Sequence, residues 1–417
     1  MNISCIKCKG VDLACGRSFC PIYVKSQALF KVRDKIGKQD FFGSAPAPFV
    51  GRYGYPDINV GILSPAETSR QAWLLDAPRF WADNNFQIQQ VVDIRSSLVN
   101  SRFRSNIKDR NRLLEISQEV GMASRPVDIE INLKEAPKLS LNTDAYLAPS
   151  GPNAKLKHAR ITENPKIDRK VDKVVSDTDM LANDAMIYLY ENNFDENFLS
   201  KLLSVGTVGL KDNRKLVPTR WSITAADDIL SKNILDEIRF HEEIDQPFSH
   251  FGSYLGNYFL ILFFPHSWSY ELFESYMPKA SFNQSASLQY TADSEPFKGR
   301  TDYAENCGGG YYASRLPVLE KLRKLKRQAS VLVLRFITGE YAVPLGVWVV
   351  REAVRKALQS RPIFFNDKSL MLRYAELLVK KRFNYDVNNL TRVSLVLNDY
   401  TRQKTLFEFT PKQPLSF

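Results

Sequence analysis

Long apolar runs are absent from this 417-residue chain. The longest such run near the middle is YFLILFF, residues 258–264, which is far too short to cross a bilayer. The first ten residues, MNISCIKCKG, lack the apolar stretch that a secretion signal needs. We therefore expect an intracellular, cytoplasmic protein with no membrane partner.

Several signatures of common enzyme classes are also missing. The four histidines, His158, His241, His250 and His266, show no metal-ligand spacing such as His-x3-His. The sequence contains no Walker P-loop and no Gly-x-Ser-x-Gly elbow. No compact Asp/Glu cluster stands out, which makes a metal-dependent nuclease a weak option. Whether the chain is an enzyme is therefore left open by its motifs.

Cysteine is scarce, and its distribution is uneven. Four of the five cysteines lie within the first twenty residues: Cys5, Cys8, Cys15 and Cys20. Clustered thiols in an intracellular protein indicate a metal rather than a disulfide framework. We expect a structural Zn²⁺ held by four thiolates, with an iron–sulfur cluster as the main alternative. Cys307 stands alone, which favours a packed or incidental thiol over a nucleophile.

What is abundant is positive charge and apolar side chains. The formal net charge is +11, which favours phosphate-rich partners through counterion release. A generally basic proteome is the plain alternative. Hydrophobic residues make up 44% of the chain, enough for a sizeable core, so wholesale disorder is not expected.

Local patterns predict a helix-rich α+β (mixed α/β) protein with a central β-sheet. The capping box of SPAE, residues 64–67, predicts a helix running to about residue 84. Apolar residues alternate over 127–133, which indicates a half-buried strand, whereas 258–264 and 329–337 are typical of strands buried on both faces. The proline-rich stretch 136–167 indicates a long connection or linker. Further helices are expected near 169–192, 196–203, 312–328, 345–358 and 368–381. The domain boundaries we expect are a zinc module over 1–40, a main domain over 41–400 and a short segment over 401–417.

Four blocks of unusual composition are similar to a known family. They are FVGRYGYPDINVG, KLVPTRWSITAADD, GGGYYASRLPVLE and PLGVWVVREAVRKAL, which span residues 49–358. Together they resemble the archaeal Nre family of DNA repair proteins, and the cysteine cluster also fits. The resemblance implies a role in DNA damage repair, association with the nucleoid, and contact with the archaeal sliding clamp, PCNA.

The segment QKTLFEFTPK, residues 403–412, resembles a clamp-binding (PIP) peptide. Such peptides have a glutamine, then an aliphatic residue and aromatic residues at fixed spacing. The glutamine position is occupied by Gln403, the aliphatic position by Leu406 and the first aromatic position by Phe409. Phe407 can contribute to the same apolar contact. The second aromatic position holds Thr410, which does not match the pattern. The alternative is a last strand folded onto the sheet. The residues KQPLSF, 412–417, are a second candidate with poorer spacing.

An alternative function is a nucleotide-dependent enzyme, such as an ADP-ribosyltransferase-like protein that uses NAD. Glycine-rich stretches beside Arg, Ser and carboxylates suggest it, and glycines before a helix can bind a phosphate. The catalytic candidates are Arg52, Arg220, Ser222, Asp227 and Glu352, and the cofactor-binding candidates are Gly308, Gly309 and Gly310. A helix cap with surface carboxylates explains Ser222 and Asp227 nearly as well, and a plain turn explains the glycines.

Two basic stretches are candidates for DNA contact. EKLRKLKR, residues 320–327, supplies Arg323, Lys324, Lys326 and Arg327 on a helix whose leucines face the other way. Arg351 and Arg355 are four residues apart and share a helical face, so they can grip phosphates together. The alternative for both stretches is an ordinary solvated face.

Overall fold

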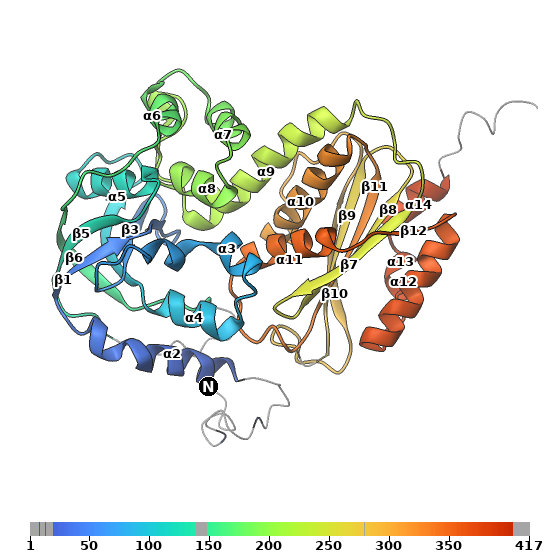
Figure 1. The fold of residues 1–417 in the computed structure, drawn as a ribbon, viewed down its shortest axis with the longest axis horizontal. Helices are drawn as coiled ribbons and strands as arrows, with labels where there is room; N and C mark the ends of the chain where they lie inside the picture. Colours follow the sequence, from blue (N-terminus) through green and yellow to red (C-terminus); the bar gives the residue numbers. More distant parts are fainter. Residues whose placement is uncertain (1–7, 9–12, 14–19, 139–147, 279, 403–417) are drawn as a thin grey trace, which may run out of the picture.

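A computed structural model describes residues 8, 13, 20–138, 148–278 and 280–402. Within this part the chain forms two six-stranded sheets, each flanked by helices, and the sheets lie side by side (Figure 1). The mixed α and β composition is as expected, but a single central sheet is not what forms. None of the described helices is both long and apolar enough to cross a membrane.

The first sheet has the strand order β1-β5-β6-β4-β3-β2. Its neighbouring strands are antiparallel except for β4 and β6, which are parallel. Helix α5 (Arg112–Met122) contacts β2, β3 and β6 and covers one face. The strands are β1 (Asp40–Ala45), β2 (Ala47–Val50), β3 (Asp57–Ser64), β4 (Val99–Asn106), β5 (Val127–Leu133) and β6 (Asn153–Ile161).

Strand β6 corrects the interpretation of residues 136–167 as a linker. The prolines around it and its own lysines obscure a short alternation in which Ala154, Leu156 and Ala159 are buried and the residues between them are exposed. Because alternate side chains of a strand point to opposite faces, three small or medium apolar residues suffice to cover the core side. The segment is therefore an interior strand, paired with both β4 and β5.

The second sheet has the strand order β10-β9-β11-β8-β7-β12, with β9 and β11 parallel and the other pairs antiparallel. All eight residues of β11 are buried. Val331 and Val333 face a core shared with the long helices, whereas Leu332 and Leu334 face a second core that includes Met371. The continuous apolar pattern of residues 329–337 is thus explained by helices on both faces. The strands are β7 (Phe248–Tyr254), β8 (Asn257–Phe264), β9 (Ser269–Tyr276), β10 (Gln289–Glu295), β11 (Ser330–Ile337) and β12 (Ile363–Phe364).

The helices divide between the two sheets. Helices α10 (Gly309–Leu325) and α11 (Trp348–Gln359) cover one face of the second sheet, and α12 (Lys368–Phe383), α13 (Asn388–Thr391) and α14 (Leu395–Arg402) cover the other. The long α9 (Thr219–Ile238) packs on α8 (Glu196–Ser204) at one end and on α10 along its length. The remaining helices are α2 (Pro21–Ile36), α3 (Pro78–Asp83), α4 (Ile88–Ser96), α6 (Arg169–Ser176) and α7 (Ala182–Glu191), with short 3₁₀ turns at Ala72–Asp76 and Lys211–Asn213.

The helix expected over residues 65–84 does not form as one piece. A 3₁₀ turn ends at Asp76, and α3 then begins at Pro78. Proline has no backbone N–H to donate and clashes with the preceding turn, so it starts a helix more readily than it continues one. This break sets the position of Arg79 at the start of α3, where it pairs with Glu196 of α8 (Glu196–Ser204).

Candidate functional site: a charge network between the two halves

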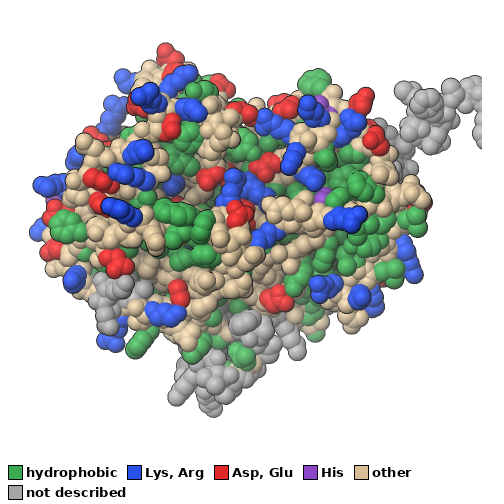
Figure 2. All heavy atoms as spheres, in the orientation of Figure 1, with side chains coloured by type: hydrophobic (Ala, Val, Ile, Leu, Met, Phe, Trp, Pro, Cys, Tyr) green, Lys and Arg blue, Asp and Glu red, His purple; other side chains and the backbone are tan. Residues whose placement is uncertain are grey.

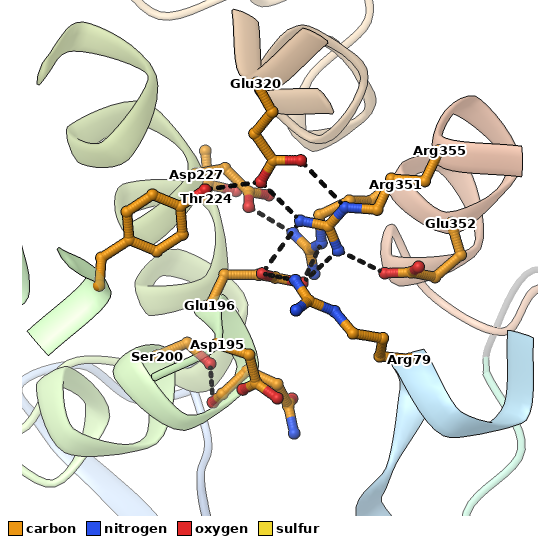
Figure 3. Close-up of polar contacts among 12 residues, drawn as sticks. Arg79, Asp195, Glu196, Ser200, Thr224, Asp227, Glu320, Arg351, Glu352 and Arg355 are labelled. Atoms are coloured by element: carbon orange, nitrogen blue, oxygen red, sulfur yellow. Dashed lines mark hydrogen bonds and ion pairs between the residues drawn. The ribbon is translucent and has the colours of Figure 1, made fainter. Parts of the chain in front are cut away.

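Charged side chains meet where helices from the two halves approach each other. Figure 2 shows Lys or Arg and Asp or Glu side chains gathered at the middle of this face, where α3, α9, α10 and α11 come together. Beneath them lies a set of charged groups, most of them buried, that is drawn in Figure 3 and that we call the interlobe network. Its members are Arg79 of α3, Glu196 of α8, Asp227 of α9, Glu320 of α10, and Arg351, Glu352 and Arg355 of α11.

Glu196 is the centre of the interlobe network. The side chain of Asp195 accepts a hydrogen bond from the backbone N–H of Phe198, which caps α8 and fixes Glu196 in its first turn. The buried carboxylate contacts Arg79 at 2.9 Å, Arg351 at 3.0 Å and Arg355 at 2.8 Å. Burial by itself raises the pKa of Glu196, but the three guanidinium groups outweigh it and hold the pKa well below its usual range. Glu196 is therefore ionised at neutral and mildly acidic pH.

One carboxylate oxygen of Asp227 is unsatisfied within the described part of the chain. Its Oδ1 pairs with Nη1 of Arg351, whereas its Oδ2 is buried with no hydrogen-bond partner among the described residues. Burial raises the pKa of Asp227 to about 6, and Arg351 offsets only part of that effect. Burial likewise raises the pKa of Glu352, which Arg355 opposes. The network therefore holds a carboxyl group whose pKa lies above the ordinary aspartate range.

The interlobe network reaches the surface through Glu320. Its carboxylate accepts a hydrogen bond from the Tyr190 hydroxyl at 2.7 Å and pairs with Arg355 at 2.9 Å. Tyr190 and Glu320 also line an open groove of about 690 Å³. Its other lining residues are Ile234, Glu237, His241, Arg323, Lys324 and Lys326.

The basic run 320–327 is partly engaged in ion pairs at this groove. Arg323 pairs with Glu191 and Glu237, both at 2.9 Å, and Arg327 lies 3.4 Å from Glu242. Lys324 and Lys326 form no ion pair within the described part of the chain and line the groove. These two lysines, rather than the arginines, are available to an anion.

A second cluster of three charges, with Arg315 and Glu295 buried, includes Asp228 of α9. Arg315, inside α10, contacts Glu295 and Asp228 at 2.5 Å each and lies over the rings of Tyr311 and Tyr312. Sequence reasoning missed this residue, although an arginine inside the apolar stretch YYASRLPVL was a usable signal, because a buried cation requires a carboxylate nearby.

The structure corrects the expectation that Arg351 and Arg355 face solvent or DNA. They do share a face of α11, but that face packs inward against α8 and α9. Arg351 is 3% exposed, and both guanidinium groups are committed to carboxylates. Helical spacing shows which residues lie on the same side, but not whether that side meets water.

The five catalytic candidates do not converge on one site. Asp227 and Glu352 belong to the interlobe network, whereas Arg52 and Arg220 lie on the surface. The buried Ser222 lies in the first turn of α9, where its hydroxyl donates to the carbonyl of Thr219. This hydrogen bond accounts for the serine as part of the helix N-terminus, as the alternative interpretation of Ser222 expected.

The glycine run precedes and begins α10, as expected. Gly308 has φ of +55°, which favours glycine. Gly310 allows close approach of a carboxylate, since a Cβ atom there would lie 2.4 Å from Oε1 of the buried Glu274. A carboxylate thus lies beside the backbone that was expected to hold a phosphate.

Two predicted sites lie wholly or partly outside the described residues. Of the four-cysteine site, Cys8 and Cys20 are described, whereas Cys5 and Cys15 are not. Among described residues no group of three or more His, Cys, Asp or Glu is placed to hold a metal. The clamp-peptide residues Gln403, Leu406, Phe407 and Phe409 are also outside.

Two family models match the chain in succession. One, described as archaeal Nre, N-terminal, matches residues 14–283, and the other, archaeal Nre, C-terminal, matches residues 295–409. The boundary between them falls at β10, ahead of α10 in the chain, so both matches contribute helices to the interlobe network.

Curated relatives match over most of their length. The chain is 37% identical to DNA repair protein NreB of Archaeoglobus fulgidus over 98% of this chain and 100% of the relative. It is 39% identical to DNA repair protein NreA of the same organism, over 88% of this chain and 91% of the relative. DNA repair protein NreA of Haloferax volcanii is 37% identical over 78% of this chain and 79% of the relative. No solved structure matches the chain significantly.

Proposed function

The chain belongs to the archaeal Nre family, and from this premise we propose that it is a DNA repair protein that binds DNA and is recruited to the sliding clamp PCNA through residues 403–409. The relatives that match over most of their length carry DNA repair in their names. DNA binding would also associate the protein with the nucleoid.

The observation that carries the recruitment proposal is the pattern of Gln403, Leu406 and Phe409. The C-terminal family match extends through residue 409 and so includes all of it. Leu406 and Phe409 would each insert into an apolar groove of the clamp, and burying such a side chain contributes about 1.5–3 kcal/mol before the cost of ordering the peptide. Gln403 would hydrogen-bond at the rim of the groove.

Calorimetric titration of archaeal PCNA tests this proposal. The double variant Leu406→Ala/Phe409→Ala should bind the clamp at least about 100-fold more weakly than the wild type, since two buried anchors are removed. The matched control is Leu415→Ala/Phe417→Ala, which removes two apolar residues a few positions away and should bind like the wild type. Equal affinity of the wild type and the first variant for PCNA would contradict recruitment through this segment.

DNA binding is proposed from the net charge of +11 together with the family. Binding that neutralises phosphates releases counterions, so the logarithm of the affinity should fall steeply and linearly with the logarithm of salt concentration. Fluorescence anisotropy of a labelled oligonucleotide at several salt concentrations measures this slope. Binding that does not change with salt would contradict a phosphate-dominated mode.

We further propose that Cys5, Cys8, Cys15 and Cys20 hold one structural Zn²⁺. Elemental analysis of the purified protein should find about one zinc per chain, and Cys8→Ser should lower that value. Cys307→Ser, far from the cluster in the sequence, is the matched control and should keep its metal. Iron in place of zinc would identify the iron–sulfur alternative.

The NAD-dependent alternative stays a prediction. Its proposed residues lie apart, with Arg52 and Arg220 on the surface and Glu352 in the interlobe network. A thermal shift on adding NAD, or ordered density after soaking, would favour it. Because these residues lie apart, we advance it no further.

A further inference from the structure

We propose that one surface of the first sheet binds single-stranded DNA, with bases stacked on exposed aromatic rings and phosphates held by adjacent cations. The inference rests on the DNA binding proposed above and adds the form of DNA and its place on the protein. The surface, which we call the stacking surface, consists of Arg52, Tyr53, Tyr55, Arg102, Arg104, Lys155, Lys157 and Trp221.

Three large rings of the stacking surface are open to solvent. Tyr53 is 72% exposed, Tyr55 43% and Trp221 45%. Tyr55 and Trp221 are in contact, with ring centroids 5.3 Å apart, although they come from a loop and a helix far apart in the sequence. The guanidinium of Arg52 lies 5.0 Å from the centroid of the Tyr53 ring. Exposed rings in contact, with a cation beside them, make an apolar platform with a positive edge.

The platform is held in place by the backbone. Residues 51–56 form the connection between β2 and β3, and hydrogen bonds from Gly51 N to Asn59 O and from Asp57 N to Gly54 O, each 2.8 Å, close it. Gly54 has φ of +84°, a conformation that favours glycine at this turn. The hydroxyl of Thr219 accepts a hydrogen bond from the Val50 N–H at 2.9 Å, which ties the start of α9, and with it Trp221, to β2.

A row of cations continues from the platform across the sheet. Arg104 adjoins the loop, since a Cβ atom added at Gly54 would lie 3.3 Å from its Nη1. Arg102 and Arg104 lie two residues apart on β4 and so share a face, and Arg102 is the cross-strand partner of Lys155 on β6. Lys157 follows on that same face.

These cations lack a direct carboxylate partner among the described residues, although the charge of Lys155, after that of Lys138, lowers the pKa of Glu135. Arg52, Arg102, Arg104, Lys155 and Lys157 form no ion pair with a carboxylate in the part of the chain that the structure describes. Partial burial lowers the pKa of Arg102, which shows that its charge is poorly compensated. A phosphate placed between Arg102 and Arg104 would supply the missing negative charge.

The chemistry of the surface favours a single strand over a duplex. Bases within a duplex are already stacked on one another, so they cannot cover protein rings, whereas unpaired bases stack on Tyr and Trp. Cations along one side of the rings fit a phosphate backbone that tracks past them. Since stacking does not depend on base identity, the surface should bind with little sequence preference.

The test uses the full-length protein and two labelled probes, an oligothymidylate of about 16 nucleotides and a duplex of equal length. Tyr53→Ala/Trp221→Ala should weaken binding of the single strand by at least about fivefold per ring, whereas Tyr53→Phe should bind like the wild type. The matched control is Phe240→Ala, which removes a ring that is 90% exposed just beyond the far end of α9. Arg104→Ala should reduce the salt slope by about one, whereas Arg112→Ala on α5 should not.

Tryptophan fluorescence supplies a readout of contact itself. Oligothymidylate should quench the wild-type emission, and Trp221→Phe should lose part of that quenching while it keeps most of its affinity. If the wild type binds single-stranded DNA but the Tyr53/Trp221 and Arg104 variants bind as well as it does, the stacking surface is wrong and the proposed DNA binding stands. If the wild type binds neither probe, both proposals fail. Equal losses for single strand and duplex would overturn the preference for unpaired bases.

Discussion

The guanidinium of Arg355 on α11 straddles the carboxylate of Glu196 on α8, with Nη1 2.8 Å from Oε1 and Nη2 3.1 Å from Oε2. Helix α8 packs against α9, α5 and β2, whereas α11 packs against α10 and the second sheet. This paired contact therefore joins elements of the two halves of the molecule (Figure 3).

Glu196→Gln should destabilise the protein strongly, because it removes the anion that three buried or half-buried guanidinium groups share. Breaking a buried pair by removing one partner costs about 3–5 kcal/mol in the free energy of unfolding. Urea denaturation of the wild type and of Glu196→Gln measures this loss. The matched control is Glu115→Gln, which breaks an exposed pair with Arg112 and should change the midpoint little. Similar midpoints for the two variants would contradict a central role for Glu196.

Asp227 should make the free energy of unfolding depend on pH at values above the ordinary pKa range of an aspartate. Its pKa is raised from 3.8 to about 6, chiefly by burial, so the native state keeps a proton that the unfolded chain has lost. The free energy of unfolding therefore gains from this carboxyl as pH falls from above 6 toward 4, and that gain is lost as pH rises through 6.

The comparison with Asp227→Asn isolates this carboxyl. The stability of the wild type relative to the variant should increase by about 1 kcal/mol between about pH 7 and about pH 5. Glu196 shifts in the opposite direction, so its contribution is lost only as pH falls below the ordinary glutamate range. A difference between wild type and variant that stays constant with pH would show that Asp227 is ionised throughout.

Gly310→Ala should destabilise the start of α10. The new Cβ would lie 2.4 Å from Oε1 of Glu274, whose carboxylate is buried and paired with Arg335. Overpacking of this kind costs about 1–3 kcal/mol. Gly309→Ala is the control, because its Cβ would come no closer than 3.1 Å to Val347 and 3.3 Å to Thr224. Thermal denaturation compares the two, and an equal loss in both would contradict the packing argument.

Cys307 should resist thiol reagents in the folded protein. It is buried, and burial together with nearby Glu274 raises its pKa well above the usual thiol range, so little reactive thiolate forms. Mass spectrometry after maleimide treatment should find the Cys307 peptide unmodified at neutral pH and modified in urea. Rapid labelling of the native protein would instead indicate an accessible thiol.

Some features followed from the sequence because local pattern determines them. The strands over 258–264 and 329–337 form as predicted, since a continuous apolar run must be covered on both faces wherever it lies. The family was identified from four blocks of residues and is confirmed by matches over most of the chain. The strand at 153–161 was missed because its apolar residues are small and prolines precede it.

The interlobe network could not be predicted from local sequence patterns. Helical spacing placed Arg351 and Arg355 on one face, but their shared partner Glu196 lies 159 positions from Arg355 in the sequence. The same is true of Asp227, which is 124 positions from Arg351. Nothing in either local pattern distinguishes a solvated arginine from one that meets a carboxylate on another helix.

The sequence by itself determined the family, the buried strands and the residues of the proposed clamp peptide, because each depends on neighbours along the chain. Only the tertiary structure decided which charges are buried together and which remain free, as between Arg355 and Arg104. The physical reason is that burying a charge is favourable only with a counter-charge close in space, and that proximity is created by packing of helices far apart in the sequence.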